Sequence, residues 1–301
     1  MTAMIASSSL SLLTGKIAVI GANSHLGRRI VLALGSDVVP IARSSLPEEF
    51  SAATVVVPDY SSIPPKAVEG CIALINCVGT ASGNLQALVK VNVDVGVAAM
   101  RMAERTGISR LVHISSFSVY GKAEYIDGST EEAPIDAYGT SKLMVDRALL
   151  SDTVDVALLR LPAIVGQGVP SKLSRLVGLW RKIHLLPVAR KAERSMISID
   201  AAASAALVLA RADGNVGGKW LVADPCPVNL YRLARFLPSM RQNRLWAIPL
   251  PNAATAALRW MFASISDRIF GSSVLIEKAN AFCSLGLTAR LDDEILQMIE
   301  R

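Results

Sequence analysis

Metal-binding residue types are scarce in this chain of 301 residues. It has three histidines far apart and four cysteines without a CxxC pair, at Cys71, Cys77, Cys226 and Cys283. A structural zinc site needs such ligands at short, regular spacings. We therefore expect no bound metal. Scattered cysteines in apolar surroundings are typical of buried thiols in a reducing compartment.

Aromatic and charged residues are also few. Aromatic residues account for 5% of the chain, which argues against a surface that stacks the bases of single-stranded nucleic acid. The 19% of charged residues against 51% of hydrophobic ones excludes a disordered chain and allows a large core. The net charge of +6 suits an anionic ligand, a nucleic acid or an acidic membrane surface, and its distribution must decide among them.

No segment has the pattern of a transmembrane helix. Residues 1–15 carry no charged side chain, so the basic start of a signal peptide is missing. The uncharged stretch from Leu245 to Leu258 is interrupted by Pro249 and Pro251. Residues 252–270 could form an apolar helix face, which packs on the protein itself or contacts a membrane surface. We expect a cytoplasmic protein, with peripheral attachment to the inner membrane as the alternative.

Short apolar runs alternate with amphipathic stretches in the first half of the chain. The runs predict buried strands at 16–20, 37–42, 54–57, 71–78, 111–115 and 154–160. The stretches predict helices at 25–35, 84–106 and 138–150. Strands that alternate with helices form right-handed βαβ units. The predicted fold class is α/β, a Rossmann-type doubly wound parallel sheet.

The pattern changes after Pro162. Residues 166–194 predict a basic loop with a short helix. The chain then predicts a helix at 200–211, a strand at 219–222 and another helix at 229–237. The last seventy residues have a mostly helical pattern. We predict an NAD(P)-binding domain of residues 1–165, on which 195–222 pack back. A small, mostly helical substrate-binding part then comprises 166–194 and 223–301.

The first predicted strand runs into a glycine-containing turn that opens a helix. A helix N-terminus offers free N–H groups and the positive end of a dipole to a pyrophosphate, and glycines allow the close approach. The position after the first strand of a βαβ unit favours this interpretation over an ordinary turn. The candidate cofactor-binding residues of the turn are Gly21, Asn23, Ser24, His25, Leu26 and Gly27.

The end of the second strand bears on the type of cofactor. An acid at this point accepts hydrogen bonds from the adenosine ribose of NAD, whereas a basic residue accommodates the 2′-phosphate of NADP. Here the chain continues as Arg43-Ser44-Ser45 without an acid. We therefore expect NADP rather than NAD, the alternative for Arg43 being a solvated loop residue.

Tyr138 and Lys142 lie four residues apart on a predicted helix, so their side chains share one face. A free tyrosine, with a pKa of about 10, is a poor base at neutral pH. A nearby lysine stabilises the phenolate and lowers that pKa, which suits the pair to carbonyl–alcohol interconversion. A hydroxyl from Ser115 or Ser116, at the end of the fifth strand, could hold the substrate oxygen.

These motifs resemble the extended short-chain dehydrogenase/reductases of the NAD-dependent epimerase/dehydratase group over nearly the whole chain. SSFSVYG and YGTSK imply a catalytic Ser116, Tyr138 and Lys142, the last two also touching the cofactor. The family pattern GxxGxxG is matched by Gly21 and Gly27, with Ser24 in place of the middle glycine. The other cofactor contacts that the resemblance implies are Asp59 and Tyr60, Cys77, Val78 and Gly79, Asn92 and Pro162.

The resemblance also implies a substrate. Members of this group act on nucleotide-diphosphate sugars, here expected to be UDP- or dTDP-linked, and a homodimer is expected. The segment RSMISID assigns a diphosphate-binding role to Arg194, with Ser116 on the sugar. Arg268 is a second diphosphate candidate. The basic segment 172–194 is thus expected to face an anionic sugar nucleotide rather than a nucleic acid.

Three reactions are common on this scaffold. Dehydratases carry an Asp–Glu pair where this chain has Phe117 and Ser118, which disfavours dehydration. A 4-epimerase gains from tightly held NAD, whereas a reductase exchanges NADPH in every cycle, so Arg43 favours reduction of a 4-keto-6-deoxy sugar. The C-terminal stretch resembles members of bacterial surface-polysaccharide pathways. A 4-epimerase and a non-catalytic NADP-binding regulatory protein remain as alternatives.

Overall fold

The computed structural model describes residues 12–50, 53–166, 168–169, 185–189, 192–229, 246–250, 272–289 and 291–300. Their centre is a seven-stranded sheet in the order β11-β7-β5-β4-β1-β2-β3, and every pairing in it is parallel. The strands are β1 (Ile17–Ile20), β2 (Val38–Ala42), β3 (Val55–Val56), β4 (Ala73–Asn76), β5 (Arg110–Ser116), β7 (Asp155–Leu161) and β11 (Gly218–Leu221). The prediction of a Rossmann-type parallel sheet is confirmed.

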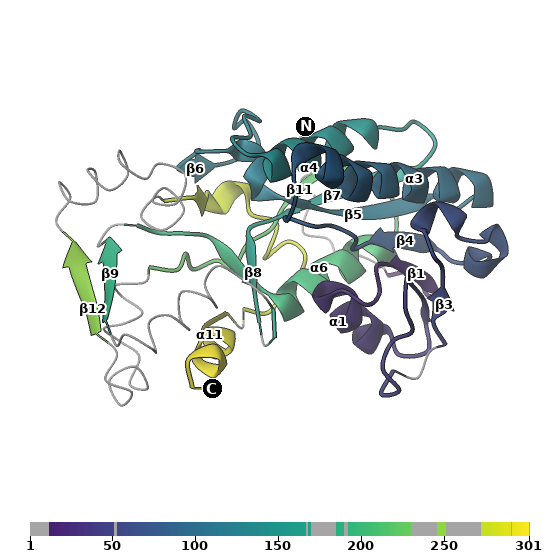
Figure 1. The fold of residues 1–301 in the computed structure, drawn as a ribbon, viewed down its shortest axis with the longest axis horizontal. Helices are drawn as coiled ribbons and strands as arrows, with labels where there is room; N and C mark the ends of the chain where they lie inside the picture. The colour runs from purple at the N-terminus through teal and green to yellow at the C-terminus, as the bar shows by residue number, and fades with distance from the viewer. Residues whose placement is uncertain are drawn as a thin grey trace.

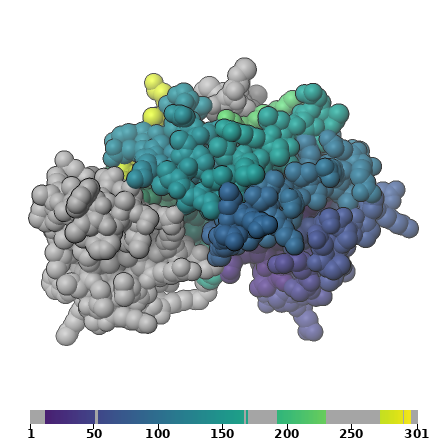
Figure 2. All heavy atoms as spheres, turned by 45° about the horizontal axis from the view of Figure 1, so that its top comes forward, coloured from purple at the N-terminus to yellow at the C-terminus, as the bar shows by residue number. Residues whose placement is uncertain are grey.

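Helices cover both faces of this sheet (Figure 1). One face carries α1 (His25–Leu34) and α6 (Ile199–Arg211), and the other α3 (Asp94–Thr106) and α4 (Ala137–Ala148). In the space-filling view of the second side, the helices hide the sheet (Figure 2). Strand β1 explains the two layers, because Ile17 and Val19 pack into one core and Ala18 and Ile20 into the other. A strand buried on both faces is therefore apolar throughout.

The strand order reverses beside β1. The chain runs outward from β1 to β2 and β3, and then returns to place β4 on the other side of β1. In open parallel sheets, ligands bind beyond the carboxyl ends of the strands at such a reversal. The turn after β1 and the loop after β4 therefore lie side by side at this reversal.

The helix predicted for 84–106 is present with an irregularity inside it. It consists of α2 (Leu85–Leu88), a π-helical turn (Val89–Val93) and α3. A π turn inserts one extra residue, which rotates the side chains around it relative to a regular helix. Asn92 lies in this turn and is fully buried. Short 3₁₀ turns occur at Tyr60–Ser62, Pro65–Val68, Phe117–Tyr120 and Glu277–Ala279.

The second half contains more strand than we expected. β8 (Ala163–Val165) pairs with β10 (Met196–Ser198), β9 (Leu185–Ala189) with β12 (Trp246–Leu250), and β6 (Tyr125–Ile126) with β13 (Val274–Leu275), while α11 spans Leu291–Glu300. The apolar runs of β9 and β12 are too short for periodicity to separate strand from helix, and each pairs with a run about sixty residues away. The helix predicted at 229–237 lies outside the described residues beyond Asn229.

No helix in the described part of the chain combines the length and the apolar character needed to cross a bilayer. The possible membrane-facing segment 252–270 lies outside that part.

Candidate active site at the carboxyl edge of the sheet

The turn between β1 and α1 has the geometry of a phosphate cradle. Gly21 has a φ of +80°, and the Ser24 hydroxyl caps α1 by accepting a hydrogen bond from the Gly27 N–H at 3.0 Å. A Cβ atom on Gly27 would lie 2.4 Å from the Gly21 carbonyl oxygen. Only glycine permits this close passage of the helix over the turn. The residues present therefore fit a dinucleotide, whose pyrophosphate would lie at the N-terminus of α1.

We expect Gly27→Ala to weaken cofactor binding about tenfold, because relieving such a backbone clash costs about 1–3 kcal/mol. The dissociation constant can be measured by quenching of protein fluorescence. Gly35→Ala is the control, since Gly35 ends the same helix (φ +58°) and a Cβ atom there would meet open space. It should lower stability by about 1 kcal/mol and leave cofactor affinity intact. Equal affinity in both variants would contradict a phosphate role for the turn.

Asn23 joins this turn to the loop after β2. Its amide nitrogen donates to the Ser44 hydroxyl at 2.8 Å, and its oxygen accepts from Arg28 Nε at 2.8 Å. Sequence reasoning missed Arg28, which lies one residue past the last glycine of the turn. His25 is exposed at the start of α1, while the Leu26 side chain is buried in the core, so Leu26 can meet a ligand only through its backbone.

The structure brings three predicted residues together beyond β2 and β3. Arg43 is exposed and hydrogen-bonds to Tyr60, and its charge also acts on Asp59. Asp59 caps the next turn by accepting the Ser61 N–H at 2.9 Å, and this bond is the main reason that its pKa is lowered. Tyr60 is half-buried, and its burial raises the pKa of the phenol. Cationic and hydrogen-bonding groups thus gather where an adenosine ribose would lie.

The side chain of Asn76, the last residue of β4, fixes the loop that follows this strand. This fully buried amide lies 3.1 Å from His113 Nδ1 and accepts the Val78 N–H at 3.0 Å. The loop then passes close to Lys142, because a Cβ atom on Gly79 would lie 3.2 Å from Lys142 Nζ. Burial raises the pKa of Cys77 to about 12, so this thiol stays protonated and unreactive.

Asn92 ties the same loop to α4. Its side chain accepts from the Thr80 N–H at 2.9 Å and donates to the Thr80 carbonyl at 3.0 Å. It also donates to the Ser141 hydroxyl at 2.8 Å. Asn92 therefore fixes the distance between the cofactor loop and the helix that carries Tyr138 and Lys142.

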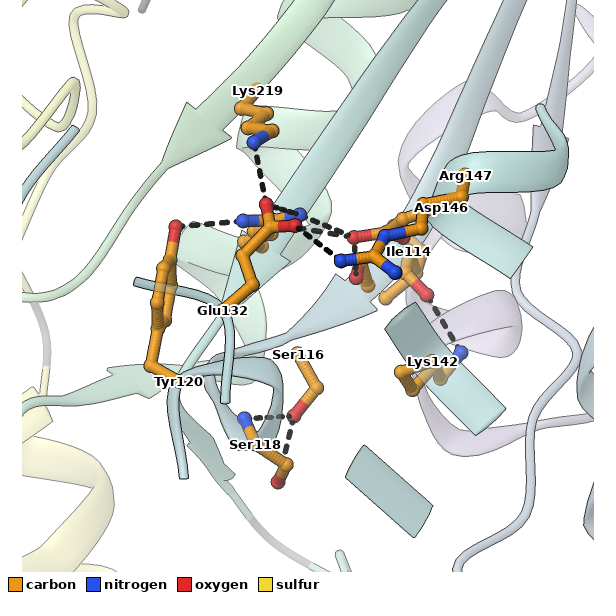
Figure 3. A network of polar contacts seen from close by, with 11 residues as sticks. Ile114, Ser116, Ser118, Tyr120, Glu132, Lys142, Asp146, Arg147 and Lys219 are labelled. Carbon is orange, nitrogen blue, oxygen red and sulfur yellow. Dashed lines mark hydrogen bonds and ion pairs between the residues drawn. The ribbon is translucent and has the colours of Figure 1, made fainter. Parts of the chain in front are cut away.

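The N-terminus of α4 brings Tyr138 to Ser116. Asp136 caps the helix by accepting the Gly139 N–H at 2.7 Å. Gly139 lets α4 approach the preceding turn, since a Cβ atom there would lie 2.4 Å from the Ser118 carbonyl oxygen. The Tyr138 hydroxyl hydrogen-bonds to Ser116. Ser116 Oγ also accepts the Ser118 N–H at 3.1 Å, as Figure 3 shows.

The pKa of Tyr138 differs from our expectation. Burial is the largest influence and raises it, while the hydrogen bond with Ser116 lowers it. Lys142 Nζ donates a hydrogen bond to the Ile114 carbonyl at 2.9 Å, and burial lowers the pKa of Lys142 to about 8. The phenol therefore keeps its proton at neutral pH, which suits a proton donor more than a proton acceptor.

A buried ionic network lies next to this group, and sequence reasoning missed it. Arg160 on β7 donates from Nε to Asp146 at 2.9 Å and from its other nitrogens to the Tyr120 hydroxyl at 2.8 Å and to Glu132 at 2.7 Å. Figure 3 shows Asp146, Glu132 and Lys219 along one series of contacts, with Lys142 and Ile114 beside it. The signal that could have revealed it is an arginine within the apolar run of 155–161, where a charge needs a partner.

A protein-family comparison matches residues 17–223 to the family described as NAD dependent epimerase/dehydratase. This is more than half of the chain. The chain belongs to the NAD dependent epimerase/dehydratase family. The resemblance inferred from SSFSVYG and YGTSK is thereby confirmed, and the protein belongs to a family of enzymes.

Solved structures with the same fold are distant in sequence. MoeE5 in complex with UDP-glucuronic acid and NAD is 19% identical, with 95% of this chain and 98% of that one covered and a TM-score of 0.73. UDP-glucuronic acid 4-epimerase from Bacillus cereus, in complex with NAD, is 16% identical over 95% and 97%, with a TM-score of 0.71. A dTDP-4-dehydrorhamnose reductase from Clostridium acetobutylicum is 17% identical over 95% and 98%, with a TM-score of 0.68. Comparison with curated proteins finds no match.

In this member of the epimerase/dehydratase family, the predicted cofactor residue Pro162 is placed, and the predicted substrate residues Arg194 and Arg268 are only partly placed. Pro162 directly follows β7 and precedes β8, whose partner β10 starts two residues after Arg194. The Arg194 backbone N–H donates to the Val228 carbonyl at 3.0 Å, and Arg194 also forms a bridge with Ser273, outside the central sheet. Arg268 lies outside the described residues.

Proposed function

We propose that this protein is an NADP-dependent reductase that converts the C4 ketone of a UDP- or dTDP-linked 4-keto-6-deoxy sugar to the alcohol. The observation that carries the proposal is the half-buried Tyr138, whose hydroxyl hydrogen-bonds with Ser116 and which lies one helical turn before Lys142 on α4. In support, solved structures with this fold include MoeE5 with UDP-glucuronic acid and NAD and a dTDP-4-dehydrorhamnose reductase.

The residues of the chain divide the work of the reaction. The bound cofactor supplies the hydride. Tyr138 gives its phenolic proton to the carbonyl oxygen, and Ser116 donates a hydrogen bond to the same oxygen as negative charge develops on it. Lys142, as an ammonium ion, stabilises the resulting phenolate and binds the ribose of the cofactor. Arg194, and Arg268 as a second candidate, would bind the diphosphate of the sugar nucleotide.

The cofactor and the sugar nucleotide are proposed to bind to different parts of the chain. Residues 1–165 with 195–222 hold the cofactor, and 166–194 with 223–301 hold the sugar nucleotide. β11 supports the first grouping, since it forms the edge of the central sheet next to β7. The basic composition of 172–194 supports the second, because a diphosphate needs counter-charge.

The preference for NADP rests on the loop after β2. Arg43 and Arg28 offer two cations at this loop, and Ser44 offers its hydroxyl. Asn23 joins Arg28 to Ser44. An NAD-specific site has an acid at this place. Guanidinium groups bind phosphate with charge-assisted hydrogen bonds. These groups would bind the 2′-phosphate of NADP.

We expect Arg43→Ala to weaken NADP binding by about tenfold or more, because a hydrogen bond to a charged group contributes about 1.5–3 kcal/mol. NAD binding should change by no more than about twofold, since NAD lacks the phosphate. Titration calorimetry with both cofactors measures the ratio. Lys66→Ala removes an exposed charge from a neighbouring turn and should leave both affinities unchanged. Equal losses for NADP and NAD would contradict the assignment.

A 4-epimerase is the second candidate. It is favoured by the similarity in fold to UDP-glucuronic acid 4-epimerase from Bacillus cereus in complex with NAD. An epimerase uses Tyr138 first as base and then as acid, so its cofactor is regenerated within each turnover and is not consumed.

NADPH absorbance in the presence of UDP- and dTDP-linked 4-keto-6-deoxy sugars tests the proposal. We expect NADPH to be oxidised in proportion to the sugar added, with one of the two nucleotides preferred. If NADPH is not consumed while NAD copurifies and NMR detects interconversion of UDP-sugars, the protein is an epimerase. Loss of NADPH without sugar would point to neither reaction.

A further inference from the structure

Asp146 is a buried carboxylate that the proposed reaction does not use. It lies on α4 one turn after Lys142, and only 2% of its surface is exposed. Its Oδ2 accepts a hydrogen bond from Ser115 Oγ at 2.9 Å and another from Arg160 Nε at 2.9 Å. Among the described residues, its Oδ1 has no hydrogen-bond partner. A buried carboxylate with a free oxygen is costly, so its retention next to the active site calls for a reason.

Arg160 supplies the counter-charge of this carboxylate, at 2.9 Å from its Oδ2. The guanidinium is 1% exposed, and its position is fixed by the Tyr120 hydroxyl and Glu132 as well as by Asp146. Burial raises the pKa of Asp146, whereas Arg160 and Ser115 lower it. Two donors point at one oxygen of Asp146, an arrangement suited to an anion.

The contacts of Asp146 and Lys142 end on adjacent residues of β5. Asp146 binds the side chain of Ser115, and Lys142 binds the carbonyl of Ile114. Ser116, the proposed substrate-binding hydroxyl, follows directly. The Asp146 carboxylate therefore affects both the charge state of Lys142 and the position of the C-terminal end of β5.

We propose that Asp146 is a positioning residue whose carboxylate, held by Arg160 and Ser115, keeps Lys142 as an ammonium ion and anchors the end of β5 beneath Ser116. The inference rests on the role of Lys142 in the proposed function. Asp146 hydrogen-bonds to Ser115 and Arg160, so it acts through its neighbours.

The other groups that face Lys142 cannot replace this charge. Cys77, in the loop after β4, is a protonated thiol, and His113 on β5 is neutral because burial holds its pKa well below the ordinary value. Tyr138, on the same helix, is a protonated phenol. Of the described groups that act on Lys142, Asp146 thus supplies the formal negative charge. Burial lowers the pKa of Lys142, and Asp146 opposes that effect.

The sign of the pH effect follows. Lys142 is active as the ammonium ion, so activity falls as pH rises through the pKa of Lys142. Replacing Asp146 with Asn removes the opposing charge and moves this alkaline limit to lower pH. An opposite charge within one helical turn shifts a pKa by about one unit or more. Removal of the Asp146 charge also lowers the pKa of Tyr138, which moves the alkaline limit in the same direction.

The experiment compares the full-length protein with Asp146→Asn, with Asp146→Glu and with Glu132→Gln. The Lys142 titration is followed by NMR of ¹³Cε-labelled lysine and assigned by its absence in Lys142→Met. We expect the Lys142 midpoint to fall by about one pH unit in Asp146→Asn and to recover in Asp146→Glu. Turnover on the alkaline side should fall about tenfold in Asp146→Asn. Glu132→Gln disturbs the same network farther from Lys142 and should lower stability without moving the Lys142 midpoint.

An unchanged Lys142 midpoint in Asp146→Asn would overturn the inference, as would an equal shift in Glu132→Gln. A shifted midpoint with an unchanged pH profile of turnover would support the inference and overturn the role of Lys142 in the proposed function. If Asp146→Asn does not fold, Ser115→Ala replaces it, because this variant removes only one hydrogen bond from the carboxylate. It should move the midpoint in the same direction by a smaller amount.

Discussion

Tyr138→Phe is expected to lower turnover about a thousandfold or more while cofactor affinity stays within about twofold, since a positioned general acid contributes about 10²–10⁴ in rate. The substitution removes only the phenolic oxygen, so the ring still fills its place beside Ser116. Without the phenolic proton, hydride transfer leaves a full negative charge on the carbonyl oxygen. Of the two side chains proposed to stabilise this charge, only Ser116 remains.

The measurements are NADPH oxidation with the accepted sugar nucleotide and cofactor titration by fluorescence. Tyr125→Phe is the matched control, because Tyr125 is 64% exposed on β6. That variant should retain full turnover. Turnover close to normal in Tyr138→Phe would remove Tyr138 from the mechanism, and a parallel loss of cofactor binding would assign it a binding role instead.

Arg160→Leu should lower the free energy of unfolding by about 3–5 kcal/mol, since removal of one partner from a buried ion pair leaves an uncompensated charge. Arg160 is 1% exposed and pairs with Asp146 and Glu132 at 2.9 and 2.7 Å. Leucine fills much of the space but offers no donor, so Asp146 is left with the Ser115 hydrogen bond alone on Oδ2. Lowering the pH should make this decrease in the free energy of unfolding smaller. At lower pH the Asp146 carboxyl, which has lost its counter-charge, takes up a proton in the folded protein.

Urea unfolding at pH 7.5 and pH 5.5 measures both parts of this expectation. Arg147→Leu is the control, because the Arg147 side chain is 67% exposed and lies 3.8 Å from the same Glu132. An exposed pair of this kind contributes about 0–1 kcal/mol. Losses of similar size in the two variants would mean that Arg160 is a packing residue rather than the counter-charge of a buried network.

Much of the fold could be predicted from local pattern. β1 is flanked on both sides by other strands and covered on both faces by helices, and this makes the run IAVI apolar throughout and recognisable. The turn from Gly21 to Gly27 was recognisable for a similar reason, since a close backbone crossing demands glycine at a fixed spacing. Tyr138 and Lys142 were recognised because both are on one helix, where spacing determines which side chains share a face.

The remaining features depend on contacts between distant segments. β9 and β12 are short apolar runs whose pairing appears only when two parts of the chain meet, and the π turn that buries Asn92 is stabilised by Thr80 and Ser141 from other segments. The pKa of Tyr138 likewise depends on burial by neighbouring elements, which raises it more than the hydrogen bond with Ser116 lowers it.

From the sequence alone came the strands and helices of the central parallel sheet, the glycine-containing turn after β1 and the Ser–Tyr–Lys residues, because helix and strand periods and glycine requirements are local properties. The tertiary structure alone decided that Arg28 reaches Asn23, that Lys142 rests on Ile114, and that Asp146 and Arg160 form a buried pair. The physical reason is that hydrogen-bond partners and the local dielectric depend on how the helices pack on the sheet. The spacing of residues along the chain does not determine that packing.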